Sequence, residues 1–98
     1  MGNNAPVKSV AISSDGSYVV TGDETGNVQL WDVTNKKNIE INSDKNVKFK
    51  HEKAILSVTI NAYKNQIKIV SGGADGKVLL WTVTVKNGQS ETSNQKLF

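Results

Sequence analysis

The sequence predicts an all-β protein made of two four-stranded antiparallel sheets. Three observations support this: one pattern occurs twice, each copy has the composition of β-strands, and turn dipeptides separate the strands. The offset between the copies is about 48 residues at the start and about 50 at the end, so the second copy has a longer first loop. The matching segments are residues 7–12 and 55–60, 18–22 and 68–72, and 26–31 and 76–81.

Each copy contains short runs that are typical of half-buried strands. Val-x-x-Val-x-Ile and Val-x-Leu-Trp are rich in β-branched residues and nearly alternate, and no segment repeats with a helical period. Asp15-Gly16, Asp75-Gly76 and Asn87-Gly88 predict hairpins with type I′ turns. We expect the last strand at Ile39–Ile41 in the first copy and at Gln89–Ser93 in the second.

Four short antiparallel strands per copy are the make-up of one β-propeller blade. The chain then divides into a lead (1–6), a first blade (7–42), a lysine-rich loop (43–50), a second blade (51–93) and a tail (94–98). Propellers close with about 4–8 blades. We therefore expect these blades to be part of a closed propeller that is completed by self-association or by further blades.

The ends of the two copies resemble the WD40 repeat, whose signature is a Gly-His pair followed by strands that end in Trp-Asp. The first copy ends in Trp31-Asp32. The second has His51, with Lys50 in place of the usual glycine, and ends in Trp81-Thr82. The resemblance covers nearly the whole chain.

This resemblance implies a buried hydrogen-bond chain in each blade, which runs from a tryptophan indole to a hydroxyl, a histidine and an aspartate. By position, the second copy has all four members of this structural tetrad: Trp81, Ser71, His51 and Asp75. Their donors and acceptors can all be satisfied along such a chain, which would stiffen the blade.

The first copy has only a degenerate tetrad. Trp31 and Thr21 are present, but Thr25 stands where the aspartate is expected and Asn3 falls near the histidine position. A partly satisfied network contributes less to rigidity. We therefore expect the first blade to be the looser of the two.

A catalytic interpretation of His51, Ser71 and Asp75 is also open, because these residue types form hydrolase triads. No nucleophile-elbow pattern accompanies them, so we interpret them as structural. One histidine without cysteine does not supply a transition-metal site, and no glycine segment opens a helix as a phosphate loop does. We expect no catalytic activity, no cofactor and no metal.

The charge pattern favours protein partners over nucleic acid. The net charge is +3, and all twelve basic residues are lysine. Nucleic-acid sites prefer the planar fork of arginine, which is absent here. Lysines near His51 form a candidate surface for acidic partners, although a plain solvated surface is the simpler interpretation. The candidate partner-binding residues are Lys45, Lys48, Lys50 and Lys53.

The resemblance implies a non-catalytic scaffold for protein–protein interaction, either as a homo-oligomer or as part of a larger propeller. The alternative is a ring that binds a small ligand, a glycan or RNA in its central channel. Candidate stacking residues for that alternative are Tyr18, Tyr63, Phe49 and Phe98. Without cysteine, a signal sequence or an apolar span, we expect a cytoplasmic or nuclear protein that does not enter a membrane.

Overall fold

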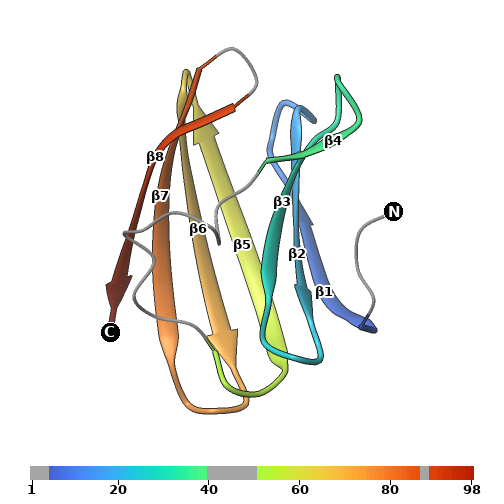
Figure 1. The fold of residues 1–98 in the computed structure, drawn as a ribbon, viewed down its shortest axis with the longest axis vertical. Coiled ribbons are helices and arrows are strands. Elements are labelled where there is room, and N and C mark those ends of the chain that lie inside the picture. The colour runs from blue at the N-terminus through green and yellow to red at the C-terminus, as the bar shows by residue number, and fades with distance from the viewer. Residues whose placement is uncertain (1–4, 40–50, 87–88) are drawn as a thin grey trace.

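The computed structural model describes residues 5–39, 51–86 and 89–98, which form two four-stranded antiparallel sheets (Figure 1). In each sheet the strands follow one another in chain order. The first sheet contains β1 (Val7–Ile12), β2 (Tyr18–Asp23), β3 (Val28–Asp32) and β4 (Lys37–Ile39). The second contains β5 (Ile55–Tyr63), β6 (Gln66–Gly73), β7 (Val78–Lys86) and β8 (Gln89–Leu97). The predicted all-β class with two four-stranded sheets is confirmed.

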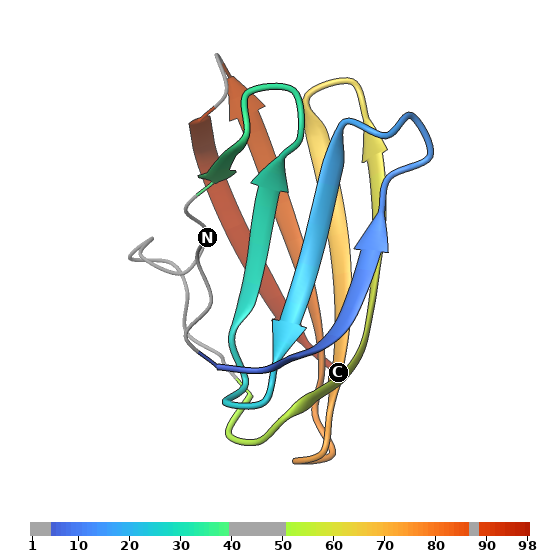
Figure 2. The same cartoon turned by 90° about the vertical axis from the view of Figure 1, so that its right-hand side faces the viewer.

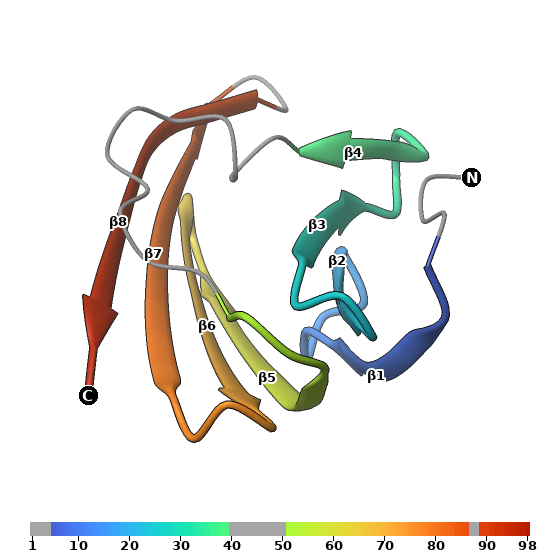
Figure 3. The same cartoon turned by 60° about the horizontal axis from the view of Figure 1, so that its bottom comes forward.

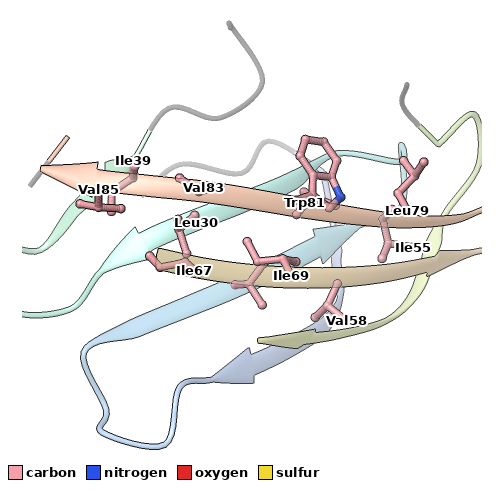
Figure 4. Close-up of a cluster of buried hydrophobic side chains, with 12 residues drawn as sticks. Leu30, Ile39, Ile55, Val58, Ile67, Ile69, Leu79, Trp81, Val83 and Val85 are labelled. Carbon is pink, nitrogen blue, oxygen red and sulfur yellow. The ribbon is translucent and has the colours of Figure 1, made fainter. Parts of the chain in front are cut away.

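The two sheets pack face to face, with the first sheet in front of the second in Figure 2. Strand β5 lies against β1 and β2, and Figure 3 shows β1 and β5 side by side. One core lies between the sheets and takes side chains from both (Figure 4). Its buried members are Val20, Val28, Leu30, Ile39, Ile55, Val58, Ile67, Ile69, Leu79, Trp81, Val83 and Val85.

The two sheets contribute different faces to this core. Leu30 points into the core from the first sheet, whereas its equivalent in the second copy, Leu80, is only half-buried. Conversely, Trp81 is buried in the core and its equivalent Trp31 is half-buried on the outer side of the first sheet. Because side chains alternate between the faces of a strand, the front of one repeat therefore packs on the back of the next.

The repeat extends to a local irregularity in strand pairing. Pairing between β1 and β2 shifts between Val7 and Ser9, and pairing between β5 and β6 shifts between Ile55 and Ser57. These positions are equivalent in the two copies, so the extra residue of the bulge falls at the same place in each sheet.

The hairpin turns were predicted correctly in place but not in type. A type I′ turn needs positive φ at both central residues. Of Asp15-Gly16 and Asp75-Gly76, only the glycines have positive φ, at 78° and 82°. Gly16 N donates to Ser13 O at 2.9 Å and Gly76 N to Gly73 O at 3.1 Å, so each glycine ends a four-residue turn. The prediction for Asn87-Gly88 lies outside the described residues.

Two strand limits differ from the sequence-based expectation. Strand β4 begins at Lys37 instead of Ile39, since Lys36, with a φ of 55°, already completes the turn after β3. Strand β8 continues past Ser93 to Leu97, where it pairs with Leu79 of β7. The segment that the sequence assigned to a tail therefore extends the second sheet. A polar strand gives no apolar alternation by which its end could be located.

Candidate functional site

Four side chains of the second sheet form one chain of hydrogen bonds. Trp81 Nε1 donates to Ser71 Oγ at 3.2 Å, and Ser71 Oγ lies 2.8 Å from His51 Nε2. His51 Nδ1 lies 3.0 Å from Asp75 Oδ1. Because a carboxylate only accepts, Nδ1 donates to Asp75. With the ring proton on Nδ1, the Nε2 atom is the acceptor that the Ser71 hydroxyl can donate to. Every polar atom named here has a partner.

The strand pairing brings these residues together. Ser71 lies on β6 and Trp81 on β7, two residues past Leu79, the partner of Ser71 in the ladder. Asp75 lies in the turn between β6 and β7, and His51 precedes β5. The sequence placed all four members of the tetrad, and the structure brings them within hydrogen-bond distance.

Gly73 makes room for the histidine and the aspartate. A Cβ atom at this position would meet the His51 Nδ1 atom and would lie 2.6 Å from Asp75 Oδ1. Gly73 was not among the predicted site residues. The signal was present, because the equivalent position in the first copy is Asp23, and the first copy has no histidine–aspartate pair at the tetrad positions.

The Asp75 carboxylate is held in its charged form. Desolvation by burial raises its pKa, but hydrogen bonds from Glu52 N, His51 and Lys77 N outweigh this and hold the pKa of Asp75 far below its usual range. The Glu52 and Lys77 amides donate at 2.8 and 3.1 Å. Asp75 therefore ties the segment before β5 to the β6–β7 turn.

The lowered pKa of Asp75 predicts a loss of stability in acid. Such a carboxyl group stabilises the fold above its unfolded pKa of about 3.9, and this contribution is lost as the pH falls toward the folded pKa. We expect Asp75→Asn to be less stable than wild type at about pH 6, with the difference narrowing at about pH 3. Urea titrations followed by circular dichroism at both pH values test this. An equal difference at both would contradict it.

The distances among Ser71, His51 and Asp75 match those of a hydrolase triad, but a substrate cannot reach the Ser71 hydroxyl. Ser71 and His51 are fully buried, and Ser71 Oγ already accepts the Trp81 indole proton. A nucleophile must reach a substrate carbonyl from an open surface. The arrangement therefore holds β5, β6 and β7 together and offers no reacting atom to a substrate.

The described part of the first sheet has a shorter network. Trp31 Nε1 donates to Thr21 Oγ1 at 3.2 Å, as its equivalent does in the second sheet. Thr25 Oγ1 donates to Asp23 Oδ1 at 2.7 Å. Asn3, which falls near the histidine position, lies outside the described residues.

Asp23 takes over the turn contacts that Asp75 makes in the second sheet. Its Oδ1 accepts from Thr25 N at 2.9 Å and from Asn27 N at 3.0 Å, and Asn27 is the equivalent of Lys77. The turn carboxylate of the first sheet thus lies two residues earlier in its copy than Asp75 does in the second. Its position is equivalent to that of Gly73, where a side chain would meet His51 and Asp75. Asp23 was not among the predicted site residues, and a position-by-position comparison of the two copies would have identified it.

Of the four candidate partner-binding lysines, the structure places one. Lys53 is exposed next to His51, beside the turn between β2 and β3. Lys45, Lys48 and Lys50 lie outside the described residues. Nearby, Lys77 Nζ and Glu52 Oε1 form an exposed ion pair at 3.4 Å.

The residues that the structure describes contain no cluster of three or more side chains suited to hold a metal ion. No helix among them has the length and apolar character needed to cross a membrane.

Two twisted four-stranded sheets stacked front to back, with a Trp–Ser–His–Asp chain in one of them, define consecutive blades of a β-propeller protein. The WD40 family (WD domain, G-beta repeat) matches the chain at residues 1–32 and 43–82, which is more than half of it. The chain belongs to the WD40 repeat family, whose members are generally scaffolds for protein interaction.

Solved structures agree on the fold. The chain is similar to the computationally designed Ika4 protein, with 22% identity and a TM-score of 0.60 over 91% of this chain. It is also similar to U3-55K, with 21% identity and a TM-score of 0.61 over 95% of this chain. It spans 47% of the length of the first protein and 25% of the second. No curated protein matches the chain.

Proposed function

We propose that this chain is a non-catalytic protein-binding scaffold whose two blades form part of a closed propeller. The missing blades come from further copies of the chain or from a larger propeller. The buried tetrad carries the non-catalytic part of the proposal, because its only nucleophilic hydroxyl, on Ser71, is sealed inside the second blade. Asp75 of the tetrad accepts a hydrogen bond from Glu52 N and so fixes the segment that carries the exposed side chains of Glu52 and Lys53.

The partner class that we propose is an acidic protein segment. Lys53 presents its charge to solvent, and the sequence places Lys45, Lys48 and Lys50 within a few residues of it. Exposed charges of one sign attract complementary partners and make the affinity depend on salt. The binding site is then the end of the blades where His51 lies.

A charge-reversal experiment tests this function. We expect a labelled peptide of about ten glutamates to bind the chain with an affinity that falls between about 50 and 300 mM salt. Replacing Lys45, Lys48, Lys50 and Lys53 by glutamate should weaken binding by about tenfold or more. Fluorescence anisotropy measures both effects.

The matched control reverses four exposed lysines elsewhere, Lys8, Lys36, Lys64 and Lys96. This variant has the same net charge as the first. If both variants lose binding equally, the peptide responds to overall charge and the proposed site is wrong.

The alternative function, a ligand, glycan or RNA in a central channel, has less support. It needs several exposed aromatic rings on one surface. Tyr63 and Phe98 are exposed, but they lie at opposite ends of the second sheet. Tyr63 pairs with Gln66 at one end, and Phe98 N donates to Val78 O at the other. Tyr18 is half-buried, and Phe49 lies outside the described residues.

A further inference from the structure

The outer faces of the two sheets are repeats of the two faces that already meet in the core. On the first sheet Val10 is 65% exposed, whereas its equivalent Val58 is 8% exposed because the first sheet covers it. On the second sheet Val70 is 38% exposed, whereas its equivalent Val20 is fully buried. Each apolar outer face thus has a known complement, which is the other outer face.

The outer side of the first sheet carries a groove whose apolar lining residues have equivalents in the core. It has a volume of about 480 Å³ and is lined by Val19, Trp31, Asp32, Val33, Lys36 and Lys37. Val19, Trp31 and Val33 are the equivalents of Ile69, Trp81 and Val83, which are all buried in the core. In the core, those residues belong to one cluster with Leu30 of the first sheet. The equivalent of Leu30, Leu80, lies half-buried on the outer side of the second sheet.

The two sheets approach each other closely at Gly22. A Cβ atom added to Gly22 would meet the Ile55 Cγ2 atom and would lie 2.6 Å from Ile55 Cβ, which is shorter than real carbon contacts. Position 22 therefore has to be glycine for Ile55 to pack against β2. Ile55 acts as a knob, and Gly22 is the socket that receives it.

The equivalent glycine in the second copy, Gly72, has no such neighbour among the residues that the structure describes. Of these, a Cβ atom there would meet only Ser57 Oγ, at 3.5 Å, which is an ordinary contact. Its φ is not in the left-handed region, and the extra residue of the nearby bulge is on β5, so the backbone does not require glycine. Glycine inside a strand weakens it and often marks a place where another chain approaches closely.

The residue equivalent to the knob, Val7, is also exposed. Val7 corresponds to Ile55 and is 46% exposed at the start of β1. The described part of the chain thus presents a socket at Gly72 on one outer face and a matching apolar knob at Val7 on the other.

We propose that a second copy of this chain docks head to tail, with Val7 of one copy seated on Gly72 of the next and the first sheet of one covering the second sheet of the other. This inference rests on the proposed propeller closure and names the blades that complete it. A repeated head-to-tail contact closes into a ring when its rotation permits. Three or four copies would supply six or eight blades, within the natural range of about 4–8.

The test is the solution mass of the chain and of its glycine variants. Light scattering behind size exclusion should give three or four times the 10.6 kDa protomer for wild type. Gly72→Ala should weaken association by about tenfold or more, because its methyl group meets Val7, while the circular dichroism spectrum stays unchanged. Gly22→Ala is the matched variant and should instead destabilise the chain itself, because its socket is filled internally by Ile55.

A second pair of variants tests the knob without touching a glycine. Val7→Asp should also yield protomers, because a charge would be buried at the contact. Ser14→Asp, which places the same charge in the exposed β1–β2 turn, should assemble as wild type does. Wild-type chain that stays monomeric at high concentration would overturn the proposal and leave these faces to blades of another sequence. Assembly that is unchanged by both Gly72→Ala and Val7→Asp would also overturn it. Neither result bears on the acidic-peptide test, so the two proposals can fail separately.

Discussion

Replacement of Ser71 by alanine should lower the free energy of unfolding by about 2–6 kcal/mol. The Ser71 hydroxyl serves two buried groups, the Trp81 indole N–H and the His51 Nε2 atom. Without it, both lose their partner inside the core, and each such loss costs about 1–3 kcal/mol. Alanine fits the space, so the effect comes from the unsatisfied polar groups.

The first sheet supplies the matched control. Among the described residues Thr21 accepts only the Trp31 indole proton, and Trp31 is half-buried, so water can replace the lost partner. We expect Thr21→Ala to cost about 1 kcal/mol or less. Urea unfolding followed by tryptophan fluorescence compares the two variants. Equal losses would mean that the tetrad does not stiffen the second blade more than the shorter network stiffens the first.

The fold and the tetrad could be predicted from sequence because both depend on spacing within a repeat. Alternating β-branched residues determine which face of each strand is apolar, and the equivalence of Trp31 with Trp81 fixes the register of the two copies. Once the register is known, His51, Ser71 and Asp75 fall at positions that adjacent strands must bring together.

The features that were not predicted depend on side-chain contacts that differ from one copy to the other. Asp23 and Gly73 differ because His51 occupies space in one sheet, and no local pattern in the sequence reports that space. The turn type at Asp15-Gly16 was wrong for a similar reason. Asp15 Oδ1 accepts from Ser13 Oγ at 2.8 Å and from Ser17 N at 3.0 Å, and these bonds accompany a turn in which Asp15 keeps negative φ.

Replacement of Gly26 by alanine should destabilise the contact between the two blades more than the same change at its equivalent, Gly76. Both glycines end a turn with positive φ, at 96° and 82°, so alanine is strained at either place by about 1–3 kcal/mol. At Gly26 the new methyl group would also meet the His51 carbonyl oxygen and lie 2.9 Å from the Lys53 carbonyl oxygen. At Gly76 it would meet no atom of the described residues within 4 Å.

The comparison separates backbone strain from interface packing, because only the second differs between the sites. A backbone atom does not move aside as a flexible side chain does, so we expect Gly26→Ala to exceed Gly76→Ala by about 1–3 kcal/mol in urea unfolding. It should also raise the hydrogen-exchange rate of the Glu52 amide, which Asp75 holds beside His51. If the two variants lose the same stability, the β2–β3 turn does not press on the segment before β5. The first blade would then be held to the second by the apolar core, which includes the close contact between Gly22 and Ile55.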